Sequence, residues 1–269
     1  MEISNGLVLV GCGKMGSAML EGWLASGIAP AKIWVLEPQP SPRLAALQAQ
    51  GLHLNAALPE KADICLLAVK PQFMKTALPQ LRAMKGGLTL YLSIAAGITL
   101  ATLGAELGEC AIIRAMPNTP AAIGCGITAL VGNARVSNDN MRMAEHLLNA
   151  IGETVQLDSE AQMDAVTALS GSGPAYVFYL IEAMSAAGMA EGLPEALATK
   201  LATATVAGAG LLARESEDTA AQLRVNVTSP AGTTEAGLRE LMNPDTGLVP
   251  LITRTITAAA NRSRELRAL

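Results

Sequence analysis

Three glycines near the start of the chain, Gly11, Gly13 and Gly16, form a G-x-G-x-x-G pattern within the stretch VLVGCGKMGSAML. Glycine lets a backbone turn sharply and lets another group approach it closely. With this spacing the glycines are typical of a loop that binds phosphate, although tight structural turns carry the same pattern. The neighbouring sequence has to distinguish the two interpretations.

The sequence around these glycines favours a dinucleotide-binding loop. Apolar residues 7–10 predict a strand before the glycines, and the residues after Gly13 predict a helix. A second predicted strand, KIWVLE, ends in Glu37, about 20 positions further on, as in dinucleotide-binding βαβ units. Gly11 would form the turn, Gly13 would admit the pyrophosphate and Gly16 would allow close helix–strand packing. The other residues of the predicted loop are Cys12, Lys14 and Met15.

Glu37 has two interpretations. Its carboxylate would accept hydrogen bonds from the 2′-hydroxyl of the adenosine ribose and would repel a 2′-phosphate, which favours NADH. Alternatively, it is a solvated carboxylate at a strand end, bent away by Pro38, and Arg43 reaches a phosphate instead. Both interpretations stay open, and with them the choice between NADPH and NADH as the cofactor.

Two later strand ends would join the same site, because nucleotides bind outside the carboxyl ends of parallel strands. These ends lie in AVKPQ and SIAAGIT. Lys70 is either an ordinary surface lysine or a cation exposed beside the cofactor. The candidate cofactor-binding residues in the two segments are Val69, Lys70, Pro71, Ala95, Ala96 and Gly97.

Histidine catalysis has little support, because neither His53 nor His146 belongs to a recognised pattern that pairs a histidine with a catalytic carboxylate or nucleophile. Reduction of a carbonyl group needs a proton donor for the forming alkoxide, whereas reduction of an already protonated imine needs less acid catalysis. A site without histidine therefore suits an imine better.

Two polar stretches rich in glycine and proline, residues 170–174 and 226–234, are candidate substrate loops. In the second, Thr233 and Thr234 would donate hydrogen bonds to a small substrate whose carboxylate lies on backbone N–H groups. The alternative is that the serines and threonines simply cap helices.

The elements that would position these residues change in character along the chain. Up to about residue 155, seven short apolar runs alternate with helical patterns, which predicts a parallel sheet covered by helices on both faces. The seven predicted strands are LVLVG, KIWVLE, ADICLLAV, LTLYLSI, CAIIRAM, GITALVG and ETVQLD. After residue 158 no strand pattern appears, and the chain is predicted to be helical. We therefore expect an α/β Rossmann-type parallel-sheet domain over residues 1–158 and an all-α dimerisation and substrate domain over residues 159–269.

Composition argues against several classes of protein. A content of 51% hydrophobic and 16% charged residues is typical of a folded soluble enzyme, and a net charge of −4 with 3% aromatic residues offers nucleic acid no binding face. The four cysteines lack metal-binding spacing and suit a reducing compartment, so no metal is expected. The uncharged residues 86–105 are interpreted as strand, turn and helix, and no export signal is recognised. We expect a cytoplasmic protein with neither membrane nor nucleic-acid partners.

The chain resembles the pyrroline-5-carboxylate reductase family over nearly its whole length. The resemblance rests on VGCGKMG, AVKPQ, SIAAGIT, IIRAMPNTPAAIGCG, LSGSGPAYVF and SPAGTTEAGL, which stand in the family's order and spacing. It implies reduction of the cyclic imine pyrroline-5-carboxylate to L-proline, the last step of proline biosynthesis, by direct hydride transfer from NADPH or NADH. It also implies self-association of the helical half into a dimer or dimer-based oligomer. The charge-free residues 201–213 are expected to form a helix buried in that interface.

The same resemblance assigns roles to single residues. Asn55 would lie near the adenosine. Lys70, Pro71 and residues 95–97 would follow the cofactor toward the nicotinamide, and residues 116–120, among them Met116, Pro117 and Asn118, would form a wall beside it. Thr234 would lie near the ring nitrogen of the substrate and is the candidate catalytic residue. The other candidate substrate-binding residues are Glu217, Ser229, Gly232 and Thr233.

Two positions depart from the family's pattern. Ala231 replaces a glycine in the S-P-G-G-T-T loop, which tightens the turn if that position needs a positive φ. Glu37 stands where members that prefer NADPH usually avoid an acid.

Two other functions stay open. The first is a β-hydroxyacid-dehydrogenase-like oxidoreductase; such enzymes resemble one another in carrying a catalytic lysine, and residues 170–184 contain no lysine. The second is a non-catalytic NAD(P)-sensing module.

Overall fold

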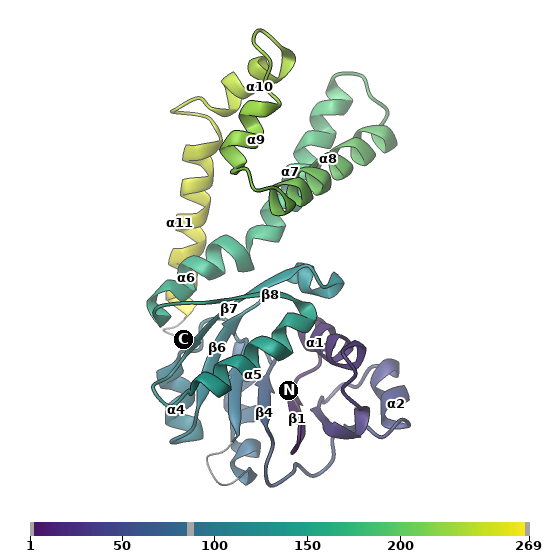
Figure 1. Cartoon of the computed structure of the whole chain (residues 1–269), viewed down its shortest axis with the longest axis vertical. Coiled ribbons are helices and arrows are strands. Elements are labelled where there is room, and N and C mark those ends of the chain that lie inside the picture. The colour runs from purple at the N-terminus through teal and green to yellow at the C-terminus, as the bar shows by residue number, and fades with distance from the viewer. Residues whose placement is uncertain (1–2, 85–88, 267–269) are drawn as a thin grey trace. The chain divides into compact units, whose positions relative to one another are not determined.

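The computed structural model of the chain describes residues 3–84 and 89–266. Eight strands form one sheet in the order β3-β2-β1-β4-β5-β6-β7-β8 (Figure 1). Neighbouring strands are parallel except for β6 and β7, which are antiparallel. The strands are β1 (Leu7–Val10), β2 (Ile33–Leu36), β3 (His53–Leu54), β4 (Ile64–Leu67), β5 (Leu90–Ser93), β6 (Ile112–Met116), β7 (Gly126–Gly132) and β8 (Gly152–Gln156).

Helices cover both faces of this sheet. One face packs against α1 (Lys14–Ala25), α2 (Pro42–Gln48) and α5 (Asn138–Leu148), and the other against α3 (Met74–Ala77) and α4 (Leu100–Leu107). Short 3₁₀ segments connect the elements at Pro30–Lys32, Pro71–Phe73, Leu78–Ala83, Thr119–Ile123, Asn149–Ile151 and Glu160–Gln162. The architecture is the α/β Rossmann-type fold that the sequence pattern predicts.

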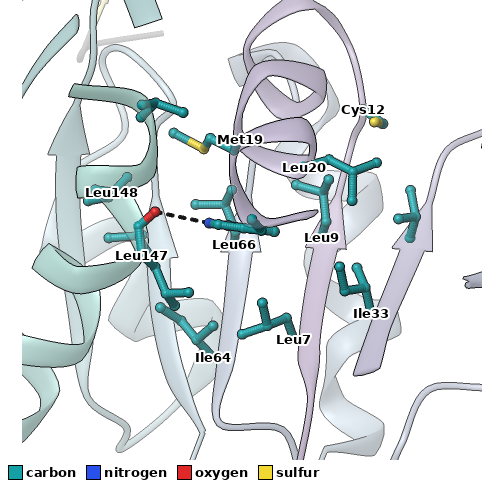
Figure 2. Close-up of a cluster of buried hydrophobic side chains, with 14 of the residues drawn as sticks. Leu7, Leu9, Cys12, Met19, Leu20, Ile33, Ile64, Leu66, Leu147 and Leu148 are labelled. Carbon is teal, nitrogen blue, oxygen red and sulfur yellow. Dashed lines mark hydrogen bonds between the residues drawn. The ribbon is translucent and has the colours of Figure 1, made fainter. Parts of the chain in front are cut away.

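The central strands are apolar along their whole length because both of their sides are covered. Every residue of β1, β4, β5 and β6 is buried. Side chains alternate along a strand, so Leu7 and Leu9 pack on the side of α1 while Val8 packs on the other side. Figure 2 shows the buried apolar cluster on the side of α1. In this cluster Trp23 donates from Nε1 to the carbonyl oxygen of Leu147 at 3.0 Å.

All seven strands predicted from the sequence occur in the sheet, but two features differ from expectation. The sequence does not predict β3, because two residues are too few to show a period. It also predicts parallel strands throughout, whereas β7 runs antiparallel to β6. The connection between these two strands, residues 117–125, is too short for the crossover that a parallel pair needs.

The chain divides into two compact units, and the division differs from the predicted domain boundary after residue 158. Among the described residues, the first unit extends to Gly171 and also contains residues 260–266. Residues 159–171 belong to it because Met163 is buried against Met116. They form α6 (Met163–Val166) and a π-helical turn, Thr167–Gly171.

The second unit, residues 172–259, is helical throughout. Its helices are α7 (Gly173–Ala190), α8 (Glu195–Glu215), α9 (Ala220–Asn226), α10 (Thr233–Leu241) and most of α11 (Leu248–Leu266). Within the described part of the chain, one helix, α8, has the length and apolar composition to cross a membrane. Few of its residues are buried by this chain itself, and α7 beside it is similarly exposed. The large apolar residues exposed on the two helices include Val177, Phe178, Tyr179, Leu180, Met184, Leu197, Leu201, Leu211 and Leu212.

Candidate active site

The fold requires glycine at two of the three positions in this loop, Gly11 and Gly16, whether or not a ligand is bound. Gly11 has a φ of +88°, and a Cβ atom there would lie 3.0 Å from the backbone of Ala68. A Cβ atom on Gly16 would lie 2.4 Å from the carbonyl oxygen of Gly11, so α1 packs against the loop too closely for a side chain. Both glycines therefore act as expected from the dinucleotide pattern.

Gly13 is different, because nothing in the protein requires it. It has an ordinary φ of −70°, and a Cβ atom there would meet no atom within 4 Å. Gly13 is also the N-cap of α1, where no side chain caps the helix and the first turn carries no acidic residue. Uncapped N–H groups and the positive end of the helix dipole favour an anion, and the open space over Gly13 admits one. The loop thus fits the pyrophosphate of a dinucleotide.

Glu37 lies directly after β2, and its carboxylate turns toward the glycine loop. Oε2 accepts a hydrogen bond from the backbone N–H of Cys12 at 2.7 Å, and Oε1 accepts one from the N–H of Gln39 at 3.0 Å. The carboxylate is therefore not bent away from the loop by Pro38. It stands as a negative charge beside the position where the sequence predicts the adenosine ribose.

Asn55 lies beside Glu37, as expected of a second residue near the adenosine. Its Oδ1 accepts the backbone N–H of Glu37 and its Nδ2 donates to the Glu37 carbonyl oxygen, each at 2.9 Å. Asn55 itself adopts a φ of +49°, a left-handed conformation that asparagine tolerates better than most residues. The two residues, far apart in the sequence, thus form one hydrogen-bonded unit.

Arg43, the alternative partner for a phosphate, is already paired. Its Nε and Nη2 atoms contact the two carboxylate oxygens of Glu21 at 2.7 and 2.8 Å. Hydrogen bonding from this guanidinium holds the pKa of Glu21 below its ordinary value. To bind a 2′-phosphate, Arg43 would have to exchange one anionic partner for another.

The remaining cofactor candidates gather at one edge of the sheet. β1, β4, β5 and β6 are neighbours and parallel, so the segments that follow them start from the same edge. After β4, Lys70 is exposed and extended, and Pro71 opens a 3₁₀ turn. After β5, Ala95 is buried and Gly97 has a φ of +78°. Val69 directly precedes Lys70, Ala96 lies between Ala95 and Gly97, and Met116 ends β6.

Asn118 holds the segment that follows β6. Its Oδ1 accepts the backbone N–H of Ile127 at 2.9 Å, and its Nδ2 donates to Oγ of Ser170 at 3.3 Å. Ser170 therefore contacts the predicted nicotinamide wall instead of capping a helix. Ser172 is at the N-cap position of α7, but its side chain makes no capping hydrogen bond.

The candidate substrate residues lie in the second compact unit, apart in the sequence from the cofactor candidates. Thr233 and Thr234 form the first turn of α10, which has Gly232 as its N-cap and no side-chain cap. A Cβ atom on Gly232 would lie 3.0 Å from the backbone carbonyl oxygen of Ser229 and 2.8 Å from its Oγ, so a side chain there would crowd the turn. Glu217 is exposed in the segment before α9. The simple capping interpretation does not hold for these two threonines.

Ala231 has a φ of +56°, so the position does adopt the conformation that favours glycine. Its backbone N–H donates to Oε2 of Glu235 in the first turn of α10. A non-glycine residue in the left-handed region costs about 1–2 kcal/mol relative to its ordinary conformation. The departure from the family's glycine is therefore accommodated with a strained backbone.

Cysteine and histidine contribute no recognisable catalytic group. Cys12, Cys65 and Cys110 are buried and Cys125 is exposed, and all four are free thiols. Burial raises the pKa of the Cys12, Cys65 and Cys110 thiols, which keeps them protonated and unreactive. His53 stacks on the ring of Trp34 at 4.2 Å between centroids. Across residues 3–84 and 89–266, no group of three or more His, Cys, Asp or Glu residues is placed to hold a metal ion.

The structure contains an ion pair that no sequence motif indicates, between the buried Arg114 and the partly exposed Glu160. Arg114 lies in β6 with no exposed surface, and Nη1 donates to Oε1 of Glu160 at 2.9 Å. The signal for Arg114 is present in the sequence as a single charge within the apolar strand IIRAM, since a buried charge needs a partner. Nothing in the local sequence indicates that Glu160 is that partner.

Two sequence profiles match the chain. One, described as pyrroline-5-carboxylate reductase dimerisation, matches residues 160–266, and the other, described as NADP oxidoreductase coenzyme F420-dependent, matches residues 7–97. The pyrroline-5-carboxylate reductase of Pseudomonas aeruginosa is 40% identical to the chain over 264 residues, covering 97% of this chain and 96% of that protein.

Solved structures of similar proteins extend over the same length. The chain matches a pyrroline-5-carboxylate reductase from Coxiella burnetii with a TM-score of 0.89 and 35% identity, over 97% of this chain and 98% of that one. It matches the Plasmodium falciparum pyrroline carboxylate reductase with NADP bound with a TM-score of 0.83 and 27% identity, over 98% of both chains.

Proposed function

This chain belongs to the pyrroline-5-carboxylate reductase family, and we propose that it reduces pyrroline-5-carboxylate to L-proline with the hydride of NADPH or NADH. It is an oxidoreductase that acts on a C=N bond. The observation that carries the proposal is the full-length similarity to reductases of this name, together with an open, uncapped helix N-terminus at Gly13 where a dinucleotide would bind.

Several groups of residues would hold the cofactor. The first turn of α1 would bind the pyrophosphate, and Glu37 with Asn55 would lie at the adenosine ribose. Residues 95–97 and 116–118 would lie beside the nicotinamide. When bound, the reduced nicotinamide supplies a hydride to the imine carbon of the substrate.

The protein has little acid catalysis to perform, because the substrate iminium already carries a proton on nitrogen. When the carbon accepts the hydride, the nitrogen keeps this proton and becomes the amine of proline. Thr234 would orient the ring by a hydrogen bond at the nitrogen, and backbone N–H groups at the start of α10 would bind the carboxylate.

An assay of NADPH and NADH oxidation tests the proposal directly. Oxidation that depends on pyrroline-5-carboxylate, with proline as the product, is the expected result. Oxidation with β-hydroxyacid-type ketones but not with the imine would favour a β-hydroxyacid dehydrogenase, and binding without oxidation would favour a sensing module. The first of these alternatives already lacks support in α7, which contains no lysine.

We expect that Glu37→Ser raises the ratio of kcat/KM for NADPH to kcat/KM for NADH by about 10-fold, since one charge repulsion at close range is removed. Glu21→Gln tests the other interpretation, because it releases Arg43 from its partner. If Arg43 sets the preference, Glu21→Gln raises this ratio and Glu37→Ser does not. Initial rates with each cofactor distinguish the two results.

The helical part matches a dimerisation profile, and we infer self-association through α7 and α8. The apolar side chains exposed on these helices would be covered by a second copy of the chain, and the small residues of α8 allow close helix packing. Sedimentation equilibrium is expected to give a dimer or a multiple of it. An active monomer would contradict this inference.

A cytoplasmic location is part of the same proposal, and four free thiols are consistent with it.

A further inference from the structure

We propose that the ion pair between the buried Arg114 and the partly exposed Glu160 is a positioning device for hydride transfer, because it ties together the two loops assigned to the nicotinamide. The proposal rests on the proposed function, since the roles of these loops come from it. Neither residue is placed in contact with substrate or cofactor, so both would act through the loops they hold.

Arg114 is a costly residue at its position. Its side chain has no exposed surface, and it lies two residues before Met116 in a strand whose other residues are apolar. A buried guanidinium is tolerated when a carboxylate compensates its charge. Nη1 donates to Oε1 of Glu160 at 2.9 Å, whereas Nε and Nη2 have no hydrogen-bond partner among the described residues. Because an apolar residue here would avoid the cost of burying this charge, we look for a role of Arg114 beyond stability.

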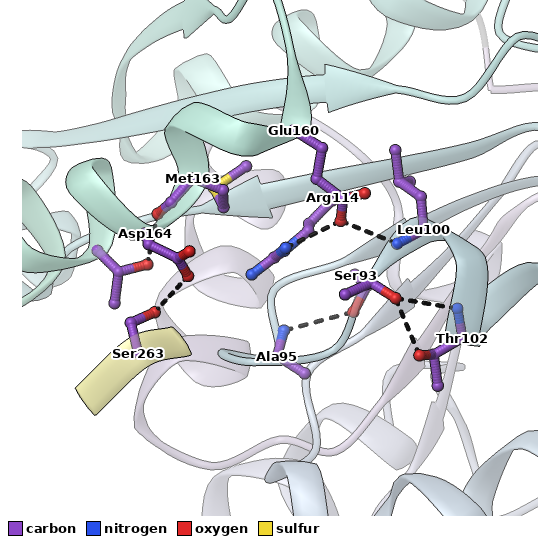
Figure 3. A network of polar contacts seen from close by, with 11 residues as sticks. Ser93, Ala95, Leu100, Thr102, Arg114, Glu160, Met163, Asp164 and Ser263 are labelled. Carbon is purple, nitrogen blue, oxygen red and sulfur yellow. Dashed lines mark hydrogen bonds and ion pairs between the residues drawn. The ribbon is translucent and has the colours of Figure 1, made fainter. Parts of the chain in front are cut away.

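Glu160 joins two structural elements through one atom. The same Oε1 that accepts from Arg114 also accepts the backbone N–H of Leu100 at 2.9 Å (Figure 3). Leu100 begins α4, and only Ile98 and Thr99 separate it from Gly97. One carboxylate oxygen therefore links β6, which leads into residues 116–118, to the helix that follows residues 95–97.

The two loops begin side by side, which makes this link effective. Ser93 at the end of β5 is paired with Arg114 in β6, so both loops leave the same edge of the sheet. Leu266 in the last turn of α11 lies against Gly97, within 3.3 Å of a Cβ atom built there. The segment after β5 is thus contacted at Gly97 by Leu266 and held at Leu100 by one hydrogen bond to Glu160.

The expected consequence concerns rate more than affinity. Much of the cofactor affinity would come from the residues assigned to the pyrophosphate and the adenosine. Among the described residues, these form no hydrogen bond or ion pair with Arg114 or Glu160. Hydride transfer depends on the distance between donor and acceptor carbons, and a misplacement of about 1 Å costs up to about 100-fold in rate.

The test compares Glu160→Ala with Glu160→Gln in the full-length enzyme. Glu160→Ala removes both hydrogen bonds, and we expect kcat to fall about 10- to 100-fold while the Kd of NADPH, measured by fluorescence, changes less than about threefold. The kinetic isotope effect with deuterium at the transferred position should rise, because hydride transfer becomes slower than product release. Glu160→Gln keeps an oxygen acceptor at the same place and should recover most of kcat.

Two further variants keep the result interpretable. Glu109→Ala removes an exposed ion pair with Arg135 and should leave kcat unchanged. If Glu160→Ala does not fold, the double variant Arg114→Met with Glu160→Met replaces the ion pair by apolar side chains and should show the same fall in kcat. A folded variant without both hydrogen bonds that keeps the parent kcat, or one that loses NADPH affinity in proportion to kcat, would overturn the proposal. Absence of imine reduction by the parent enzyme would instead refute the proposed function.

Discussion

Gly13→Ala is expected to leave the fold intact and to weaken cofactor binding by about 100-fold, the loss expected when one or two hydrogen bonds to a charged phosphate are lost. The fold does not require glycine at this position, because a Cβ atom would meet nothing within 4 Å and φ is −70°. Only an approaching ligand would be obstructed. The measurements are the melting temperature and the Kd of NADPH and NADH.

Two other glycines serve as controls for this experiment. Gly104→Ala places a methyl group on α4 where it also meets no atom within 4 Å, so both stability and cofactor binding should be retained. Gly16→Ala places a Cβ atom 2.4 Å from the carbonyl oxygen of Gly11, so it should lower the melting temperature strongly. If Gly13→Ala binds the cofactor as well as the parent, the pyrophosphate does not lie at this helix N-terminus.

Thr234→Ala is expected to lower kcat/KM for pyrroline-5-carboxylate by about 10- to 1000-fold, the range typical of one lost donor to the transition state. Thr234 lies in the first turn of α10 and is not needed there as a cap. Its hydroxyl is therefore available to hydrogen-bond the ring nitrogen. Because the iminium already carries its proton, loss of this hydroxyl should reduce turnover without abolishing it.

Thr234→Ser retains the hydroxyl and should keep most of the activity, which separates hydrogen bonding from the packing of the methyl group. The Kd of the reduced cofactor should be unchanged in both variants. If Thr234→Ala retains full activity, the substrate loop is wrongly assigned. The same conclusion follows if the parent reduces hydroxyacid-type ketones and leaves the cyclic imine untouched.

Most of the sheet was predictable because buried parallel strands have a strong local pattern. β1, β4, β5 and β6 are apolar at every position or nearly so, since helices cover both faces, and such runs stand out from the amphipathic helices between them. The direction of β7 was not predictable from its own residues. It depends on the length of the connection after Met116, which is a property of the chain and not of the strand.

The boundary between the compact units shows a second limit of local patterns. The pattern changes from strands to helices after residue 158, but the first unit continues to Gly171. A helical sequence pattern does not indicate which of the two units a helix packs in. Met163 packs with Met116 and Val131, and Ser263 donates to Oδ1 of Asp164 at 2.8 Å, so residues from three distant segments complete one unit.

The amino-acid sequence by itself determined the dinucleotide loop, the α/β order of the first part and the helical character of the second. These features follow from glycine spacing and from apolar periods, which act over a few neighbouring residues. Only the tertiary structure decided which polar groups meet: the Glu37 carboxylate with the N–H of Cys12, and Glu160 with both Arg114 and Leu100. These partners lie 25, 46 and 60 residues apart, so strand order and side-chain direction bring them together, and no local pattern encodes either.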